Sequence, residues 1–442
     1  MKTRYIKALF SAIALTLTSY TAMAQSGLTG SWNGVLTFAG GELTIVLHID
    51  PSGSTMDSPD QGTYGIPAVL KELTDSKVNV EVPSVGASFE ANLMFGLLIG
   101  RFKQSGMEIP LSLKPGDIER KRPQTPQEPY PYTSEEVTFT NPEDGAVLSG
   151  TLTYPADYSS ETPVVLLVSG SGPQNRDEEV YAHKPFLVIA DHLARNGIAS
   201  LRYDDRAVGK STGNAVGATT DTFKKDALSG LEFLRSLRKF SKVGLAGHSE
   251  GGTIAFLLAG EGRTDFMISL AGTVTDGATA LVEQNRKILM GSGIPESAVN
   301  DYCEVLAKLY ADPDMTSEEL GKLASGLAPD MKQNIMTIRD TKDPWVQHFI
   351  SFDPGEAIRK IECPVLALNG ENDVQVIADS NIPRLQELLK EDVKNMIKTY
   401  PGLNHLFQHC TTGMPDEYGK IEETISTEVL EDITSWINNI DR

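Results

Sequence analysis

The sequence predicts an α/β protein: a mostly parallel, doubly wound sheet that carries a helical insertion and follows a small antiparallel β domain. Three patterns indicate this fold class. Residues 27–113 alternate apolar and polar side chains with the period of two that is typical of half-buried strands. From residue 132 onward, short continuous apolar runs alternate with helical segments, as in a sheet covered on both faces. Between about residues 273 and 353 this alternation stops, and the pattern is helical throughout.

The first 24 residues have the pattern of a secretory signal peptide. Three basic residues precede or begin an apolar run from Ile6 to Leu17, and the small-residue site Ala22-Met23-Ala24 follows it. The run is too short for a membrane-spanning helix, and no cysteine follows the site to carry a lipid. We therefore expect cleavage before Gln25 and export, to a periplasm, of a chain without a transmembrane segment.

Residues 25–113 are expected to form the small antiparallel β domain. Leu43, Ile45, Leu47 and Ile49 alternate with Glu42, Thr44, Val46 and His48, and glycine-containing turn signals separate the runs. Residues 114–131 contain five prolines among charged and glutamine residues. This composition favours an extended, semi-rigid linker, so we place the domain boundary there.

The sheet domain is expected over residues 132–442. Its predicted strands are 137–140, 146–154, 164–168, 198–203, 242–246, 266–270, 364–369 and 396–400. Predicted helices between them are 184–196, 221–237, one opening at Gly251-Gly252, 383–390 and 422–439. Within the insertion we expect helices at 279–290, 296–311, 317–324 and 332–339, the third opened by a capping box of Thr316 and Glu319.

Charge and cysteine content exclude several classes of partner and cofactor. The 442 residues include 39 basic and 59 acidic side chains, a formal charge of −20, which disfavours nucleic acid as a partner. Cys303, Cys363 and Cys410 lack the paired spacing of a zinc or redox motif, so we expect no disulfide framework. We predict no metal and no cofactor, while one bridge between two of the three cysteines stays open.

The segment from Gly247 to Gly251 carries the strongest chemical signal. It has the form G-x-S-x-G and lies where a predicted buried strand ends and a helix begins. In that setting the serine, Ser249, occupies a tight turn that small neighbours on each side allow to close. The helix behind it directs its first amides at the reacting centre and favours developing negative charge there. We therefore predict that Ser249 is a nucleophile.

A serine nucleophile needs a histidine base and a carboxylate that orients it, here in the chain order serine, acid, histidine. Of the seven histidines, His405 fits best because it follows the predicted strand 396–400 at the carboxyl edge of the sheet. His248 is inside the turn, where we expect its side chain to point away from that of Ser249. For the acid we choose Asp373, in the loop after strand 364–369, with Glu371 as the fallback.

An oxyanion hole requires two backbone N–H donors. One is expected from the residue after the nucleophile, Glu250. The other is expected from the glycine-containing loop after strand 164–168, where either Gly170 or Ser171 can supply it. The choice between these two stays open.

With Ser249, Asp373 and His405 in this order, the chain from about residue 132 resembles the α/β-hydrolase superfamily. Three segments, 168–178, 201–206 and 247–252, resemble a bacterial group of secreted carboxylesterases described as lysophospholipase-like or dipeptidyl-peptidase-like. Residues 57–67 and 110–113 resemble the small β domain that these proteins often carry in front. Many members have His-Gly where this chain has Ser169-Gly170, so an oxyanion role for residue 169 does not carry over.

The resemblance implies hydrolysis of a small-molecule ester through an acyl-enzyme, with residues 273–353 as a cap over the site. A serine peptidase or aminopeptidase would use the same three residues and would need a carboxylate, such as Glu250, to hold a substrate amine. An acyltransferase would differ only in excluding water. A non-catalytic carbohydrate- or lipid-binding protein would leave Ser249 idle. The acyl group, the alcohol, the role of the β domain and the oligomeric state are not predicted.

Overall fold

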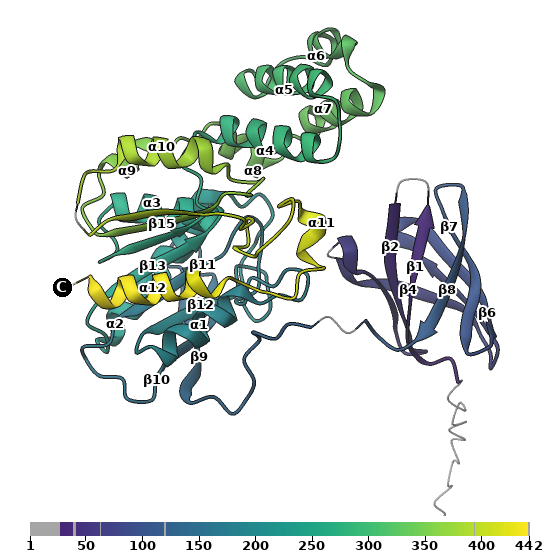
Figure 1. Cartoon of the computed structure of the whole chain (residues 1–442), viewed down its shortest axis with the longest axis horizontal. Coiled ribbons are helices and arrows are strands. Elements are labelled where there is room, and N and C mark those ends of the chain that lie inside the picture. The colour runs from purple at the N-terminus through teal and green to yellow at the C-terminus, as the bar shows by residue number, and fades with distance from the viewer. Residues whose placement is uncertain (1–26, 39–40, 62, 119–120, 393, 441–442) are drawn as a thin grey trace, which may run out of the picture. The chain divides into compact units, whose positions relative to one another are not determined.

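A computed structural model describes residues 27–38, 41–61, 63–118, 121–392 and 394–440 of the chain (Figure 1). The chain forms two compact units, Met1–Ile118 and Glu119–Arg442. The expected signal peptide and its cleavage site lie outside the described residues. Among the helices of the described ranges, none has both the length and the apolar character needed to cross a bilayer.

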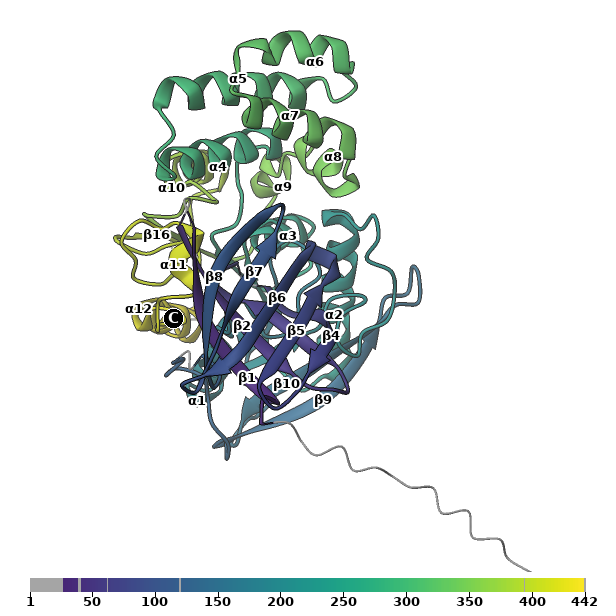
Figure 2. The ribbon, with the colours of Figure 1, turned by 90° about the vertical axis from the view of Figure 1, so that its right-hand side faces the viewer.

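The first unit is a closed barrel of antiparallel strands (Figure 2). Its strands in order are β1 (Gly30–Phe38), β2 (Gly41–Ile49), β3 (Ser54–Ser58), β4 (Thr63–Leu73), β5 (Lys77–Val82), β6 (Ala87–Met94), β7 (Leu97–Gln104) and β8 (Met107–Pro115). The predicted antiparallel β domain is confirmed, and β1 closes it by pairing with β8. Gly34 allows the close approach at this seam, since a Cβ there would lie 2.2 Å from the carbonyl oxygen of Ser112.

The proline-rich segment, expected at residues 114–131, differs from a plain extended linker in two places. Strand β8 extends to Pro115, inside the expected linker. Further along, Arg122 donates hydrogen bonds to the carbonyls of Tyr181, Gly419 and Ile421, and Gln124 donates to the Ile425 carbonyl at 2.7 Å. Prolines cannot join a hydrogen-bonded ladder, so side chains fix this stretch onto the second unit instead.

The second unit is built on an eight-stranded mixed sheet in the order β16-β15-β14-β13-β11-β12-β10-β9. The strands are β9 (Tyr132–Thr140), β10 (Val147–Pro155), β11 (Val164–Val168), β12 (Ala199–Tyr203), β13 (Val243–His248), β14 (Met267–Leu270), β15 (Val365–Gly370) and β16 (Met396–Tyr400). The six strands from β11 to β16 are parallel, and β9 and β10 extend the sheet antiparallel. The predicted mostly parallel sheet is confirmed.

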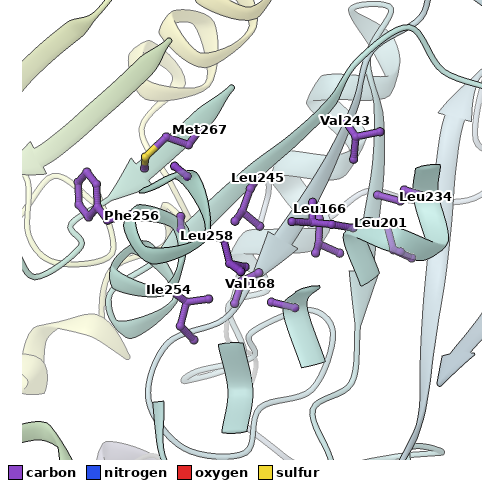
Figure 3. Close-up of a cluster of buried hydrophobic side chains, with 14 of the residues drawn as sticks. Leu166, Val168, Leu201, Leu234, Val243, Leu245, Ile254, Phe256, Leu258 and Met267 are labelled. Carbon is purple, nitrogen blue, oxygen red and sulfur yellow. The ribbon is translucent and has the colours of Figure 1, made fainter. Parts of the chain in front are cut away.

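Helices cover both faces of this sheet, which explains why central strands such as β11 and β13 are buried along their whole length. Alternate residues of β11 point to opposite faces: Leu166 joins a core beneath one set of helices, and Val165 and Leu167 join the other. The first set comprises α2 (Thr220–Leu237), α3 (Glu250–Gly260), α9 (Gly355–Arg359) and α10 (Ala378–Leu388); the second comprises α1 (Pro185–Arg195) and α12 (Thr427–Asn439). Figure 3 shows the first core, where β-strand leucines meet Leu234 of α2 and Ile254 and Leu258 of α3.

The predicted helical insertion is confirmed, and it forms a cap with a hydrophobic core of its own. Its helices are α4 (Gly277–Gly291), α5 (Glu296–Ala311), α6 (Ser317–Leu323), α7 (Pro329–Thr341) and α8 (Pro344–Ile350). Both views place α5, α6 and α7 together at one end of the second unit (Figures 1 and 2). The predicted capping box is present: Thr316 accepts from the Glu319 amide, and the Glu319 carboxylate accepts from the Thr316 amide.

Several helices differ from those expected, and three of them illustrate why. Helix α8 was not predicted, although Asp343 caps it and Pro344 occupies its first turn. Helix α10 begins at Ala378, five residues before the proline that we took as its start, so Pro383 is inside the helix. Helix α12 begins at Thr427 rather than residue 422. Prolines and polar first turns left these starts ambiguous in the sequence.

Candidate active site

Ser249 occupies a strained turn between β13 and α3. Its backbone has φ 54° and ψ −120°, a conformation that residues with a side chain rarely adopt. The turn closes only because its flanking residues are glycines. A Cβ at Gly247 would lie 2.0 Å from the Gly251 carbonyl oxygen, and a Cβ at Gly251 would lie 2.1 Å from that of Val168. The strained turn expected from the G-x-S-x-G pattern is therefore present.

Asp373 and His405 form a buried hydrogen-bonded pair. The Oδ2 atom of Asp373 lies 2.8 Å from Nδ1 of His405, and both residues are 3% exposed. The other carboxylate oxygen accepts from the amides of Gln375 and Val376 at 2.7 and 2.9 Å. Because an ionised carboxylate can only accept, Nδ1 carries the ring proton and Nε2 has the free lone pair of a base. Glu371, the fallback acid, is exposed in the same loop.

Ser249 and His405 line the same pocket, whose volume is about 430 Å³. Loops at the carboxyl ends of β11, β13, β15 and β16 supply one wall, as expected for an open parallel sheet. The cap supplies another, through Ala280, Leu281 and Gln284 of α4 and through Trp345 and Phe349 of α8. Among the described residues that line the pocket, there is no lysine or arginine.

Both candidate oxyanion donors in the loop after β11 line the pocket, but they differ in whether their amides are already hydrogen-bonded. The Gly170 amide donates to Oε1 of Glu178 at 2.6 Å, so its N–H is already engaged. The Ser171 amide has no acceptor within the described part of the chain, and Ser171 lines the pocket. Glu250 is the first residue of α3, where an amide has no partner inside the helix. The geometry therefore favours Ser171 over Gly170, together with Glu250.

The Glu250 side chain is buried beside the nucleophile. Its Oε1 accepts from the Thr220 hydroxyl at 2.6 Å and from Nε1 of Trp345, in the cap, at 2.9 Å. No hydrogen bond reaches Oε2 from the residues that the structure describes. Glu250 is 3% exposed and lines the pocket. It is thus a buried carboxylate with neutral partners on one oxygen alone.

The expectation for His248 was wrong. Its ring lies against the ring of His405, with centroids 4.7 Å apart, and lines the pocket rather than pointing away from the site. Nε2 of His248 donates to the His405 carbonyl at 2.9 Å, and Nδ1 lies 2.9 Å from Oε1 of Glu178. Sequence reasoning missed this contact because Glu178 and His248 are 70 positions apart in the chain.

Asp205, which follows strand β12, holds the oxyanion loop after β11 through hydrogen bonds. The Ser169 hydroxyl and the Gln174 amide both donate to Oδ2 of Asp205 at 2.9 Å. Burial raises the pKa of Asp205 to about 7, and the negative charges of Asp226 and Glu178 raise it further. The hydrogen bonds from Ser169 and Gln174 oppose this change. Ser169 therefore supports the loop rather than the reaction.

Neither metal ligation nor disulfide bonding is evident in the described structure. Across the described ranges, no three histidine, cysteine or acidic side chains cluster in a way that could hold an ion. All three cysteines are free. Charged side chains near the oxyanion loop pair with one another: Arg176 lies 2.8 Å from Asp204, and Arg206 lies 2.7 Å from Asp226.

Comparisons with known proteins point to one family. The family model described as serine aminopeptidase, S33, matches residues 183–409, just over half of the chain. Esterase EstD of Thermotoga maritima is 27% identical over 296 residues, 66% of this chain and 65% of that protein. An acyl transferase of Shewanella woodyi is 29% identical over 135 residues, 30% of this chain and 42% of that protein. Each match thus spans less than two thirds of the relative's length.

Among solved structures, one similar chain is Est1E from Butyrivibrio proteoclasticus with ferulic acid bound. It is 17% identical, with a TM-score of 0.42, and the match covers 69% of this chain and all of that one.

The raised pKa of Asp205 predicts a pH dependence of stability. An unfolded aspartate has a pKa of about 3.9, so between about pH 4 and 7 the folded chain holds one more proton than the unfolded chain. Its contribution to the free energy of unfolding must therefore fall as pH rises through this window, and level off above it. Replacing Asp205 by Asn keeps an acceptor oxygen and removes the titration.

Between pH 5 and pH 8 we expect the urea midpoint of Asp205→Asn to rise relative to that of the wild type. The corresponding change in the difference between their unfolding free energies is up to about 3 kcal/mol. Parallel midpoints of the two proteins across this range would contradict it. Asp157→Asn, at an exposed aspartate, is the matched control and should follow the wild type at every pH.

Proposed function

The chain belongs to the family described as serine aminopeptidase, S33, and we propose that it hydrolyses carboxylic esters of small molecules through an acyl-enzyme on Ser249. One observation carries the proposal: the strained Ser249 and the Asp373–His405 pair meet at a single pocket. Similarity to an esterase over 296 residues supports the same reaction class.

In the acylation step, the Ser249 hydroxyl attacks the ester carbonyl carbon while Nε2 of His405 takes the hydroxyl proton. The imidazolium that forms is stabilised by Asp373, whose Oδ2 accepts from Nδ1 at 2.8 Å. Two backbone amides hold the Asp373 carboxylate, so it cannot swing away as the charge develops. The alcohol then leaves with the proton from His405 Nε2, and the acyl group stays on Ser249.

Negative charge on the carbonyl oxygen is received by the amides of Glu250 and Ser171. The N-terminal end of α3 adds its dipole to this site. Water, deprotonated by His405, then attacks the acyl-enzyme and releases the acid. The cap residues Leu281 and Phe349 offer apolar surface to the substrate, and Gln284 offers an amide.

We expect Ser249→Ala and His405→Ala to lower kcat for p-nitrophenyl esters by about 10⁴-fold or more, since each removes a group that acts in bond making. Both variants should also lose labelling by a fluorophosphonate probe. Asp373→Asn should lower kcat by roughly 10³- to 10⁴-fold, because it stabilises the wrong tautomer of His405.

Glu371→Gln, in the same loop but exposed, is the control for Asp373→Asn and should retain activity. A folded wild-type protein that neither reacts with the probe nor turns over any ester in a series of graded acyl length would overturn the proposal. Within that series, the preferred acyl length measures the apolar depth of the pocket.

We also propose that the chain is exported after cleavage before Gln25, on the strength of its leader-like first 24 residues. When the full chain is produced in a Gram-negative host, N-terminal sequencing of the periplasmic fraction should begin at Gln25. Deleting residues 6–17 should keep the protein in the cytoplasm. An intact Met1 in the periplasmic fraction would contradict the cleavage site.

A second candidate function is aminopeptidase activity, and the Glu250 carboxylate favours it. This carboxylate is buried at the pocket, and neither its hydrogen-bond partners nor the pocket's lining residues carry a compensating lysine or arginine. A buried charge without a counter-charge is costly, and a substrate ammonium group would compensate it.

This candidate predicts faster cleavage of alanine p-nitroanilide than of propionyl p-nitroanilide, which differs only in lacking the amine. The ratio of kcat/KM values should be about 10- to 100-fold and should collapse in Glu250→Gln, as expected for a charged hydrogen bond of 1.5–3 kcal/mol. Glu232→Gln, at an exposed site on α2, is the control. Equal kcat/KM values of the wild type for the two anilides would contradict aminopeptidase activity and would not affect the esterase proposal.

A further inference from the structure

Glu178 and His248 form a buried pair at the pocket that the proposed mechanism does not use. Glu178 is 5% exposed and His248 is 7% exposed. They come from different segments: Glu178 from the loop between β11 and α1, and His248 from the last position of β13, directly before the nucleophile. Placing an acid and a base out of water together costs solvation energy, which their mutual contact at 2.9 Å offsets only if the geometry is good.

Two hydrogen bonds connect this pair to the oxyanion loop and to the backbone of His405, and a third joins its two members. Oε1 of Glu178 accepts from the Gly170 amide at 2.6 Å, in the oxyanion loop. The same oxygen lies 2.9 Å from Nδ1 of His248, in the turn that carries Ser249. Nε2 of His248 donates to the backbone carbonyl of His405 at 2.9 Å.

The protons of the pair are fixed by its partners. A carbonyl oxygen can only accept, so Nε2 of His248 must carry a proton. One further proton lies between Nδ1 and the Glu178 carboxylate, and the pair is neutral overall. Burial by itself would lower the pKa of His248, but the charge and hydrogen bond of Glu178, with the His405 carbonyl, raise it above the ordinary value. The charge and hydrogen bond of Glu178 therefore favour the protonated form of the His248 ring.

The backbone conformation of Glu178 and the contact between the His248 and His405 rings are further signs that the pair is held in a fixed position. Glu178 has φ 50°, a left-handed conformation that costs free energy at a residue with a side chain. The His248 ring packs against the His405 ring at 4.7 Å, so the base is held at its backbone and at its ring face. Engaging the Gly170 amide turns that N–H away from the substrate and leaves the next amide, of Ser171, at the pocket.

We propose that Glu178 and His248 are positioning residues that hold the oxyanion loop, the nucleophile turn and the backbone of His405 in the arrangement that the reaction requires. The inference rests on the proposed ester hydrolysis at Ser249. Neither residue exchanges a proton with the substrate. Each acts through a neighbour: Glu178 through Gly170 and His248, and His248 through His405.

The first test is Glu178→Gln in the full chain. The side-chain oxygen of a glutamine can accept from the Gly170 amide, and its NH₂ group can donate to Nδ1 of His248. Glutamine has no negative charge, however, to favour a proton on both ring nitrogens of His248. We expect kcat for p-nitrophenyl esters to fall about 10- to 100-fold, as for a misplacement of reacting groups, with KM within about threefold. Glu179→Gln, the neighbouring and more exposed acid of the same loop, should match the wild type.

The second test separates the two nitrogens of His248. Gln places an N–H near the position of Nε2, so His248→Gln keeps a donor for the His405 carbonyl. Asn places one near Nδ1, so His248→Asn keeps the contact with Glu178 and loses that to His405. We expect His248→Gln to retain severalfold more kcat than His248→Asn. If Glu178→Gln melts below the assay temperature, this pair of variants carries the test by itself.

The third test asks whether the two residues act as one unit. In a double-mutant cycle, Glu178→Gln with His248→Gln should cost no more in kcat than the worse single variant. Fluorophosphonate titration gives the fraction of active folded sites to which every kcat is referred. Unchanged kcat in the single variants, a loss confined to KM, or costs that multiply in the double variant would each overturn the inference.

These outcomes are distinct from failure of the proposed function. If the wild type shows neither labelling nor turnover, ester hydrolysis at Ser249 fails, and the positioning role fails with it. If the wild type is active and Ser249→Ala is not, while all Glu178 and His248 variants retain the wild-type kcat, only the inference fails.

Discussion

The tight turn at Ser249 is the constraint on which the rest of the site depends. It requires two glycines, because Gly247 and Gly251 each approach backbone atoms closer than any Cβ would allow. It also requires a rigid frame, because the strained φ of Ser249 persists only if strand β13 and helix α3 are both held. The fully buried neighbours in the two cores of the sheet supply that frame. Packing energy from the sheet thus maintains a local conformation that the serine alone would not adopt.

Around this turn the chain buries an unusual number of polar and charged groups. Asp373, His405, Glu178, His248, Glu250 and Asp205 are all at most 7% exposed. Most are satisfied by one another or by backbone amides, which makes their burial tolerable, and the raised pKa of Asp205 records part of its cost. Two carboxylate oxygens, Oε2 of Glu178 and of Glu250, lack a protein partner in the described structure. Both belong to residues that line the pocket.

The cap contributes a different kind of constraint. It has its own hydrophobic core, so its outer helices α5, α6 and α7 fold around one another. Its inner helices, α4 and α8, face the pocket, and Trp345 bonds directly to Glu250 beside the nucleophile. Part of the pocket wall is therefore made of side chains that the sheet does not position.

The sequence by itself determined most of the strands and helices and the G-x-S-x-G motif, because these depend on neighbours along the chain. Strand β11, the capping box of Thr316 and Glu319, and the turn around Ser249 are all local patterns, and each was predicted. The chain order of acid and histidine likewise selected Asp373 and His405, which the structure brings to 2.8 Å. Pro383 misled the same reasoning, since a proline tolerated inside α10 looks like a helix start.

Tertiary structure decided what distant segments do to one another. Barrel closure between β1 and β8 depends on Gly34 meeting Ser112, 78 positions away, which no local pattern encodes. The choice of Ser171 over Gly170 depends on Glu178, whose side chain reaches back across the loop to the Gly170 amide. The position of His248 against His405 spans 157 residues. Hydrogen bonds of this kind need exact distances between folded segments, and only the packed sheet and its loops provide them.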